Sequence, residues 1–360
     1  MRNICFAQQD LRLTHGGTTK MKVTVIIPSF KRPTDLRRCL VALSLQSKPA
    51  DEILVVGREE DAETSDLVST AALRLPALRR VPVSKPGVIE ALNSGFDNAS
   101  GDVWVVTDDD SEPQSNWLER IGDTFSDAPI GAVGGRDWLQ LPDEPLLFRP
   151  SLVSKLGVLT WYGALYGNHH CPLHGHTKKV MFLKGVNIAF RRRALGRYRI
   201  DNSLRGSGAQ SGWEMDLCLQ TLQAGFQVMF DDRILVKHYC SPRMAGEDRT
   251  QLTGSLFPDI CFNNHYLIAK HFGLSRAIAY FCHERLLGSR SVPGLLACLK
   301  WSYKGDHDTW RRLAQMTWMG ASGFRLGRRA RRRAYRELPS DGQVKQMQGV
   351  KNSQCVSGRS

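Results

Sequence analysis

Short apolar runs alternate with amphipathic helical stretches over residues 22–137, and this alternation restricts the fold more than any other feature of the chain. In chain order the segments are a strand at 23–27, a helix at 33–47, a strand at 53–56, a helix at 61–73, a strand at 80–83, a helix at 87–98 and a strand at 103–106. Runs without polar alternation are typical of strands buried on both faces of a sheet. Because strands joined by helices form right-handed crossovers, the segment predicts an α/β fold with a mostly parallel central sheet flanked by helices.

The rest of the chain has a less regular pattern. We expect two short strands, at 180–183 and 234–236, on either side of a helix at 214–224. Beyond Cys240 the pattern is helical, which predicts a helical C-terminal extension. Residues 1–20 lack the apolar stretch of a secretory signal, and we expect them to form a disordered leader.

Composition excludes several classes of protein. Hydrophobic residues make up 42% of the 360 residues and charged residues 23%, which is ordinary for a globular protein and unlike a disordered or collagen-like chain. No stretch approaches the roughly 20 uninterrupted apolar residues of a membrane-spanning helix. The nine cysteines are scattered singly, which favours reduced thiols in the cytoplasm over a disulfide framework.

Three adjacent carboxylates, Asp108, Asp109 and Asp110, follow the strand at 103–106. In open α/β sheets, ligands bind at the carboxyl ends of the strands. Like charges this close raise one another's pKa, and a hard divalent cation such as Mg²⁺ or Mn²⁺ removes the conflict. Asp108 and Asp110 project to the same side of an extended chain, so this pair is the predicted chelate. A solvated acidic turn is the alternative.

Further motifs stand in a definite order around this triplet. In chain order the set is Pro28-Ser29-Phe30-Lys31-Arg32, Ala91-Leu92-Asn93, Ala99-Ser100-Gly101-Asp102, Thr107-Asp108-Asp109-Asp110, Gly185-Val186-Asn187-Ile188-Ala189-Phe190-Arg191-Arg192 and Glu214-Met215-Asp216-Leu217, closed by His238. Each motif alone is a weak signal, but the ordered set over residues 22–240 resembles family-2 glycosyltransferases with a GT-A fold. The resemblance implies a nucleotide-sugar donor and transfer to a hydroxyl acceptor with inversion.

The resemblance also implies roles for single residues. Donor binding is implied for Pro28, Ser29, Phe30, Arg32, Asn93, Asp108 and Asp109. Asp108 and Asp110 match the Asp-x-Asp of the family, which holds an Mn²⁺ or Mg²⁺ ion, and His238 either completes the metal shell or makes a structural hydrogen bond. Asp109 either assists its neighbours or is solvated.

The catalytic base is assigned less directly. The family pattern is Glu-Asp-x-Asp-Leu, whereas this chain has Glu214-Met215-Asp216-Leu217. Aligning Asp216-Leu217 with the Asp-Leu of the pattern puts Glu214 at the base position. Aligning Glu214 with the first acid of the pattern puts Met215 there instead, and Met cannot accept a proton. We therefore expect Glu214 to be the base, with Asp216 as the alternative. The alternative for either carboxylate is a purely structural role, in which its charge stabilises the N-terminus of the helix.

The chain departs from the family pattern at the donor side. Where relatives carry an acidic pair after the second strand, this chain has Gly57-Arg58-Glu59-Glu60-Asp61, and the inserted Arg58 either meets phosphate or is a surface residue. Phe30 replaces a frequent Tyr, and Leu92 replaces a frequent Arg. The Gln-x-x-Arg-Trp signature of processive synthases is absent, so transfer of a single sugar is expected.

The segment from His169 to His176 contains four histidines and Cys171, which are ligand types that suit Zn²⁺. It lacks the second, distant ligand pair of a structural zinc site. A loop near the active site is therefore the alternative interpretation, and the sequence leaves the choice open.

Arginines are concentrated in the last part of the chain and contribute to the net charge of +14. Seven arginines between 324 and 336 are interleaved with apolar residues, which favours either a basic amphipathic helix on anionic lipid or a solvated tail. A membrane contact would suit a lipid-linked acceptor. The predicted location is cytoplasmic, with peripheral association at the inner membrane face left open.

These features give one predicted domain organisation. It comprises a leader at 1–20, a catalytic domain at 21–240 with a nucleotide-binding half at 21–137 and an acceptor half at 138–240, a helical region at 241–323 and a partly disordered basic tail at 324–360. The expected pathway is synthesis of a bacterial surface polysaccharide or glycolipid.

Three other functions fit the sequence less well. A dinucleotide-dependent enzyme would have Gly-x-Gly-x-x-Gly after the first strand, where this chain has Ile27-Pro28-Ser29-Phe30. The positive charge permits a nucleic-acid-binding protein, but no aromatic and basic recognition module is visible and no nucleic acid is expected. An inactive glycosyltransferase-like scaffold is the third alternative, because Met215 and Arg58 alter the acidic motifs.

Overall fold

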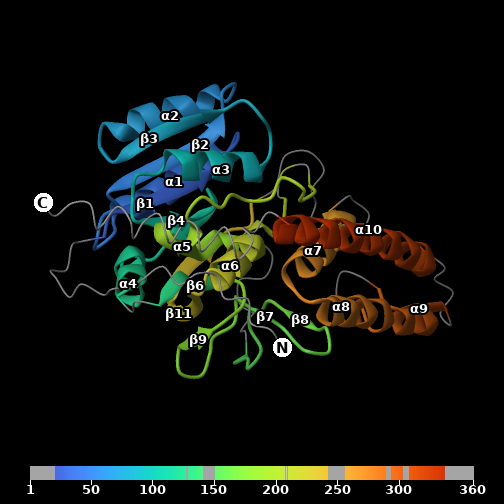
Figure 1. The fold of residues 1–360 in the computed structure, drawn as a ribbon. Coiled ribbons are helices and arrows are strands. Elements are labelled where there is room, and N and C mark those ends of the chain that lie inside the picture. The colour runs from blue at the N-terminus through green and yellow to red at the C-terminus, as the bar shows by residue number, and fades with distance from the viewer. Residues whose placement is uncertain are drawn as a thin grey trace, which may run out of the picture.

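The N-terminal half of the central sheet is entirely parallel (Figure 1). The structure, a computed structural model, describes residues 21–126, 129–140, 151–206, 208, 210–241, 256–288, 293–302 and 308–336. The strands β1 (Val23–Pro28), β2 (Glu52–Arg58), β3 (Leu78–Val83) and β4 (Val103–Val106) lie in the order β3-β2-β1-β4. They are connected by α1 (Pro33–Ser44), α2 (Ala62–Ala72) and α3 (Val88–Asn98). The four strands and three helices predicted for this segment are confirmed.

The second half of the sheet is mixed. β10 (Ile188–Arg191) lies between β4 and β6 (Ile130–Leu139) and is antiparallel to both, and β11 (Gln227–His238) follows β6 in parallel. β5 (Ser111–Pro113) and β9 (Thr177–Lys179) pair with β11 in antiparallel fashion. The other elements of this half are α4 (Trp117–Thr124), the two-stranded sheet of β7 (Val158–Leu159) and β8 (Leu165–Tyr166), the 3₁₀ turn η1 (Gly185–Asn187), α5 (Arg192–Leu195) and α6 (Trp213–Gln223).

One predicted strand is wrong. Residues 180–183 form no strand, because β9 ends at Lys179 and the chain then turns toward Gly157. The Gly157 carbonyl accepts hydrogen bonds from the backbone N–H groups of Met181 and Phe182, which therefore do not join the sheet. The strand predicted at 234–236 exists as part of the longer β11, and α6 confirms the helix expected at 214–224.

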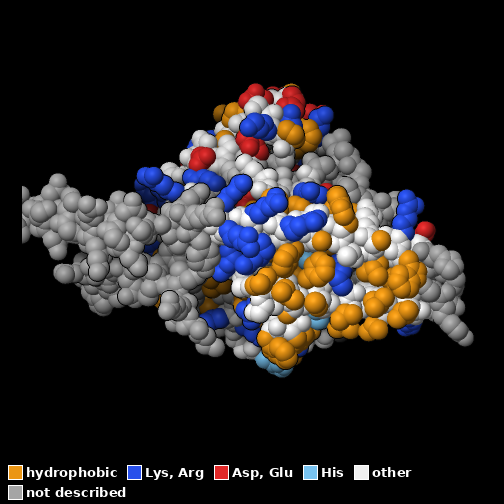
Figure 2. All heavy atoms as spheres, turned by 45° about the vertical axis from the view of Figure 1, so that its right-hand side comes forward, with side chains coloured by type: hydrophobic (Ala, Val, Ile, Leu, Met, Phe, Trp, Pro, Cys, Tyr) orange, Lys and Arg blue, Asp and Glu red, His pale blue; other side chains and the backbone are white. Residues whose placement is uncertain are grey.

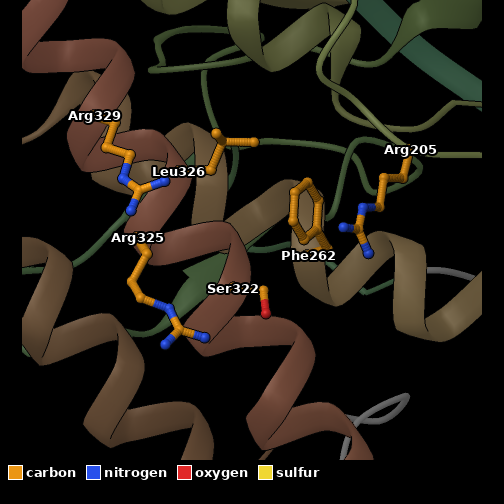
Figure 3. A pocket seen from close by; sticks show the side chains of 6 residues that line it. All are labelled: Arg205, Phe262, Ser322, Arg325, Leu326 and Arg329. Atoms are coloured by element: carbon orange, nitrogen blue, oxygen red, sulfur yellow. The ribbon is translucent and has the colours of Figure 1, made fainter.

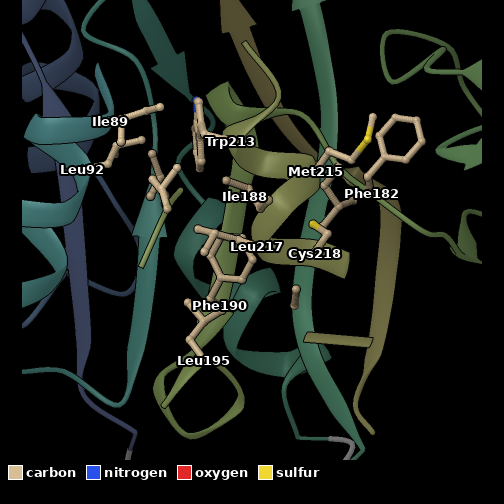
Figure 4. Close-up of a cluster of buried hydrophobic side chains, with 14 of the residues drawn as sticks. Ile89, Leu92, Phe182, Ile188, Phe190, Leu195, Trp213, Met215, Leu217 and Cys218 are labelled. Atoms are coloured by element: carbon tan, nitrogen blue, oxygen red, sulfur yellow. The ribbon is translucent and has the colours of Figure 1, made fainter. Parts of the chain in front are cut away.

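Strand alternation sends buried side chains into two hydrophobic layers, one on each face of the sheet. On β1, Ile26 packs in the layer that includes residues of α3 and α6, whereas Val25 and Ile27 pack with residues of α1, α2 and α4. Trp213 and Leu217 of α6 lie in the first layer with apolar residues of β10 (Figure 4). This packing fixes α6 against the sheet.

Beyond β11, the described residues form four helices: α7 (Leu256–His271), α8 (Leu274–Leu286), α9 (Leu295–Ser302) and α10 (Asp308–Arg336). The long α10 lies along α7 (Figure 1). A Cβ at Gly323 or Gly327 of α10 would overlap the carbonyl oxygen of Phe262 or Tyr266, respectively, so the glycines permit this close approach. The helix passes without a break through Gly323, the residue after which the basic tail was predicted to begin. In the described part of the chain, every helix is too short or too polar to cross a bilayer.

Candidate active site

The three carboxylates after β4 meet the last residue of β11. The antiparallel pairing of β5 with β11 sets His238 opposite Ser111, directly after the triplet. The backbone N–H of Ser241 donates to Asp110 Oδ2 at 3.0 Å, which holds the chain beyond β11 against the same carboxylate. Residues 128 positions apart are thereby brought to one edge of the sheet, where the parallel strands β1 and β4 also end.

Asp108, Asp110 and His238 form a compact group of potential metal ligands. One ligand atom from each lies within 4.8 Å of the others. His238 Nε2 is 3.4 Å from Asp110 Oδ1 and 3.9 Å from Asp108 Oδ2. Asp110 Oδ1 and His238 Nε2 are both buried without a hydrogen-bond partner, whereas Asp108 is partly exposed. With His238 deprotonated, two buried ligand atoms that face one another and a third open to solvent fit a divalent cation that keeps positions for substrate oxygens.

The charges in this group hold each other in the ionised form. Burial alone would raise the pKa of Asp110, but the His238 ring and the Arg32 guanidinium outweigh it and hold the pKa at about 2. Burial alone would lower the pKa of His238, but contacts with Asp110 and Asp137 raise it to about 11. Without another cation, the imidazolium therefore supplies the positive charge that the two carboxylates require.

Asp109 faces away from this group. Its carboxylate accepts hydrogen bonds from Ser29 Oγ at 2.9 Å and from Arg32 Nη1 at 2.8 Å. Burial raises the pKa of Asp109 to about 7, and the charge of Arg32 acts against this rise. Arg32 also donates to the Ser241 carbonyl at 2.8 Å. Asp109 and Arg32 thus connect the loop after β1 with the triplet and with the chain beyond β11.

Two residues behind His238 were not predicted from the sequence. Asp137, on β6, is fully buried and has an ion pair with Lys184, and its Oδ2 lies 3.9 Å from His238 Nδ1. Burial opposes ionisation of Asp137, but His238 and Lys184 lower its pKa to about 2. A carboxylate behind a histidine orients the ring. The only signal in the sequence was an Asp beside Arg136 in a strand whose other residues are uncharged.

Glu214 and Asp216, the two candidate bases, have opposite environments. Glu214 lies in the first turn of α6 and is partly exposed, and burial followed by the charge of Asp108 raises its pKa to about 7. Asp216 is fully buried and accepts hydrogen bonds from His271 Nε2 at 2.7 Å and Lys270 Nζ at 2.9 Å. These contacts overcome the effect of burial and lower the pKa of Asp216. Asp216 therefore joins α6 to α7.

The loop after β1 presents one aromatic ring to solvent. Pro28 ends β1, Ser29 is buried, and the Phe30 side chain is 38% exposed. Lys31 has a positive φ of 54°, and its N–H donates to Asp61 Oδ2 at 2.6 Å. Asp61 also accepts from the Thr64 N–H and caps α2. Asp61, the last acid of the altered motif at 57–61, thus holds the loop after β1 in place.

Two other residues singled out in the sequence have local partners. Arg58 pairs with Glu60 at 2.6 Å, and its guanidinium carbon lies 6.0 Å from the centre of the Phe30 ring. Asn93 exchanges two hydrogen bonds with the backbone of Ile200, at 2.9 and 3.1 Å. Asn93 therefore connects α3 to the loop before α6, which is a structural bond beside the donor role implied by the resemblance.

The histidine-rich segment does not converge on one point. His169 is buried, its Nε2 lies 3.0 Å from the Phe182 carbonyl oxygen, and burial lowers its pKa to about 4. His176 is exposed and its Nδ1 contacts Asp232 at 2.8 Å. Among the described residues, none of this segment belongs to a group with metal-ligand spacing. The geometry favours a loop over a zinc site.

A second group with metal-ligand spacing lies in the C-terminal helices and consists of Cys261, His265 and Glu284. It already contains a cation, because Arg285 Nη2 donates to Glu284 at 2.6 Å and lies 3.6 Å from Cys261 Sγ. His265 Nδ1 is 2.9 Å from the Cys261 carbonyl oxygen. These contacts connect α7 with α8, and we interpret the group as part of the helix packing.

Comparisons with known proteins place the chain among sugar-transferring enzymes. A sequence profile described as "Glycosyltransferase like family 2" matches residues 21–253. Glycosyltransferase AglE of Haloferax volcanii is 32% identical over 118 residues, which cover 31% of this chain and 38% of that protein. The pre-mycofactocin glycosyltransferase of Mycobacterium tuberculosis is 26% identical over 239 residues, which cover 66% of this chain and 45% of that protein. Each match therefore spans less than half of the relative's own length.

A solved structure has a similar fold. GalNAc-T7, determined with UDP, GalNAc and Mn²⁺, aligns with a TM-score of 0.55 and 14% sequence identity. The alignment covers 86% of this chain and 59% of that chain. At this identity the similarity concerns the fold alone.

Proposed function

Because the chain belongs to glycosyltransferase family 2, we propose that it transfers one sugar from a nucleotide-diphosphate donor to a hydroxyl group of an acceptor, with inversion and with a divalent cation. The GT-A fold predicted from the sequence is confirmed by the family and by the solved structure. The observation that carries the proposal is the convergence of Asp108, Asp110 and His238, with two of the ligand atoms buried and unpartnered.

Asp108, Asp110 and His238 would hold the cation. Mn²⁺ is the first choice, because a structure of the same fold contains Mn²⁺ with UDP, and Mg²⁺ is the alternative. When bound, the ion supplies positive charge that offsets the charge developing on the leaving nucleoside diphosphate. His238 would release its proton on ligation, since a ligating imidazole is neutral, and Asp137 behind it would keep the ring oriented.

The loop after β1 would hold the nucleoside. Phe30 offers an exposed aromatic face on which a base can stack. Ser29 and Arg32 are held by Asp109, so the loop is fixed before the donor arrives. Pro28, Asn93 and Asp108 complete the donor-binding set that we propose. These contacts do not specify which nucleobase is bound. Asp61, an acid of the segment where relatives bind the nucleotide, already accepts hydrogen bonds from Lys31 and Thr64.

Glu214 would accept the proton of the attacking acceptor hydroxyl. It is partly exposed and close enough to Asp108 for that charge to raise its pKa, which is the environment of a general base tuned toward neutral pH. A single displacement with inversion needs only one such base. Asp216 is a weaker candidate, because its oxygens already accept hydrogen bonds from Lys270 and His271 inside the protein.

The C-terminal helices support a location at an anionic membrane surface. Exposed apolar side chains are concentrated on them and lie near a group of Lys and Arg side chains (Figure 2). The exposed apolar residues of α8, α9, α10 and the residue after α8 are Leu274, Ile278, Leu286, Leu287, Leu296, Leu299, Trp310, Trp318 and Leu326. Apolar residues bordered by arginine match the chemistry of an anionic bilayer surface. We therefore propose a peripheral enzyme of the cytoplasmic membrane face in bacterial surface polysaccharide or glycolipid synthesis.

The proposed reaction is tested by donor hydrolysis. Wild type, Asp110→Asn and the control Asp97→Asn, which removes an exposed carboxylate on α3, are assayed against a panel of nucleotide sugars with Mn²⁺, Mg²⁺ or EDTA. We expect hydrolysis of at least one donor by wild type and the control, dependent on the metal, and none by Asp110→Asn. Nucleotide binding should depend on metal in wild type and lose that dependence in Asp110→Asn. Hydrolysis by wild type in EDTA, or by Asp110→Asn at the wild-type rate, would reject the proposal.

A further inference from the structure

A cleft lined by three arginines lies between α10, α7 and the loop that precedes α6. It has a volume of about 360 Å³, and its walls are Arg205, Phe262, Ser322, Arg325, Leu326 and Arg329 (Figure 3). Arg325 and Arg329 are one helical turn apart on α10, so their side chains are on the same face of the helix. Arg205 comes from the loop, more than 100 residues earlier in the chain. Because of this separation, the sequence alone does not indicate that the three arginines lie together.

The cleft contains positive charge without a matching carboxylate. None of its six lining residues is acidic, and among the described residues Arg205, Arg325 and Arg329 have no ion pair. The Arg205 guanidinium carbon lies 3.8 Å from the centre of the Phe262 ring, and its Nη1 is 3.6 Å from Met319 Sδ. Stacking on a ring fixes the guanidinium plane and leaves N–H donors for another group. Arginine forks match phosphate oxygens in this way.

The cleft is joined to the proposed active site through one asparagine. Asn263 of α7 accepts from the Arg205 N–H at 2.7 Å and donates to the carbonyl oxygens of Arg205 and Ser211 at 2.8 and 2.9 Å. Ser211 precedes the helix whose first turn carries Glu214. The loop with Arg205 at one end and Glu214 just beyond the other is therefore fixed to α7. A ligand in the cleft would lie beside the acceptor half of the molecule.

The cleft adjoins a surface that combines arginine side chains with two apolar ones. A second hollow of about 280 Å³ shares Arg325 and Arg329 with the first and is also lined by Leu274, Phe324, Arg328 and Arg332. Leu274 begins α8 and is 50% exposed, and Leu326 in the first cleft is 37% exposed. A ligand with a phosphate group and an apolar chain would find both kinds of contact here.

We propose that Arg205, Arg325 and Arg329 bind the phosphate group of an acceptor that carries an apolar chain. The inference rests on the proposed function, because it names the acceptor class of the same enzyme. The phosphate is held in the cleft, the apolar chain extends toward α8, and the acceptor hydroxyl is directed toward Glu214. A phospholipid headgroup has the same phosphate chemistry, so the test distinguishes these two sources.

The test uses binding by the full chain and does not depend on turnover. Binding of farnesyl phosphate below its micelle concentration and of inorganic pyrophosphate is measured by calorimetry for wild type, Arg325→Gln and Arg329→Gln. The control is Arg333→Gln, which removes the same charge from an exposed position of α10 that lines neither hollow. We expect each cleft variant to weaken binding of farnesyl phosphate at least about tenfold and the control less than about twofold.

A second arm measures co-sedimentation with phosphatidylcholine vesicles with and without phosphatidylglycerol. If the cleft is specific for the acceptor phosphate, all three variants lose vesicle binding to a similar small extent, because removal of one surface charge is then the only change. Three results would overturn the proposal. They are equal weakening of farnesyl phosphate binding by all three variants, no binding of farnesyl phosphate by wild type, and cleft variants that lose vesicle binding but keep farnesyl phosphate binding. Donor hydrolysis tests the proposed function separately, so the two failures can be told apart.

Discussion

Two carboxylates on α6, Glu214 and Asp216, are separated by a single residue but have different surroundings and therefore different expected roles. Glu214 and Asp216 project from one helical turn, yet the first is near enough to Asp108 to feel its charge and the second contacts Lys270 and His271 of α7. Substituting them therefore has separable effects. We expect Glu214→Gln to abolish sugar transfer while the melting temperature stays within about 2 °C of wild type, because this side chain anchors no other element.

The matched substitution Asp216→Asn should act on stability. It leaves Lys270 and His271 of α7 next to a neutral group in a buried site, and breaking a buried pair costs about 3–5 kcal/mol. For a protein of 360 residues that corresponds to a melting temperature roughly 4–7 °C lower. Thermal unfolding and donor hydrolysis of both variants check the assignment. Full activity of Glu214→Gln, or an unchanged melting temperature of Asp216→Asn, would exchange their roles.

The pH dependence of transfer follows from the raised pKa of Glu214. Burial and then the charge of Asp108 raise this pKa to about 7, and Lys184 acts in the opposite direction. A general base must be deprotonated, so kcat/KM should be low under acidic conditions and rise with pH to a plateau above about pH 7. A cation beside Asp108 moves this rise to lower pH. A pH–rate profile from 5 to 9 tests the sign, and a rate that falls with increasing pH contradicts it.

The sequence predicted single ligands better than their surroundings. The carboxylates of Asp108 and Asp110 follow a recognisable strand, and His238 follows an apolar run, so each had a local signal. Asp137 had only a weak local signal and Lys184 had none, because their importance arises where β6 meets β11 and the residue before η1, and not from neighbours in the chain. For the same reason, the engagement of Asp109 with Ser29 and Arg32 was not visible before the fold was known.

At the scale of elements, regular periodicity was predictable and irregular pairing was not. The strands β1, β2 and β4 of the parallel half have continuous apolar runs because helices cover both faces, and that pattern is readable. β5 and β9 have three residues each and owe their existence to β11. The run at 180–183 is apolar because it is largely buried, but only the Val180 N–H bonds to a strand, at Val228 of β11, whereas the N–H groups of Met181 and Phe182 bond to Gly157.

The crossing of α7 and α10 depends on glycine, and this gives an element-scale prediction. Alanine is ordinarily about 1 kcal/mol better than glycine inside a helix. At Gly323 a methyl group would overlap the Phe262 carbonyl, so we expect Gly323→Ala to destabilise the protein by about 1–3 kcal/mol. Gly122→Ala on α4 is the control, since its nearest contact is the flexible Lys48 amine at 3.5 Å, and it should be neutral or stabilising.

Urea unfolding of both glycine variants measures the difference. Opposite signs for the two substitutions support a tightly packed crossing of α10 and α7. A stabilised Gly323→Ala variant would mean that the helices separate easily and that the glycines have no role in their contact.

Across the whole molecule, the C-terminal helices support the proposed active site instead of forming an appendage. Arg331 of α10 donates to the carbonyl oxygens of Lys270 and His271 at the end of α7, at 3.1 and 2.8 Å. The side chains of the same two residues hold Asp216 on α6. The arginines of α10 therefore have different roles. Arg331 caps the C-terminal end of α7, whereas Arg325 and Arg329 line the cleft.

This chain of contacts predicts the effect of removing α10. A chain ending at residue 307 keeps every residue proposed for donor, metal and base, but it exposes the α7 face that meets the glycines and loses the Arg331 bonds. We expect a lower melting temperature and loss of donor hydrolysis, because α7 no longer holds α6 and Glu214 with it. A chain ending at residue 336 retains α10 and is the control. If the shorter chain melts and hydrolyses the donor like the control, the catalytic domain is independent of its C-terminal helices, and the cleft that we assign to the acceptor would have no mechanical link to Glu214.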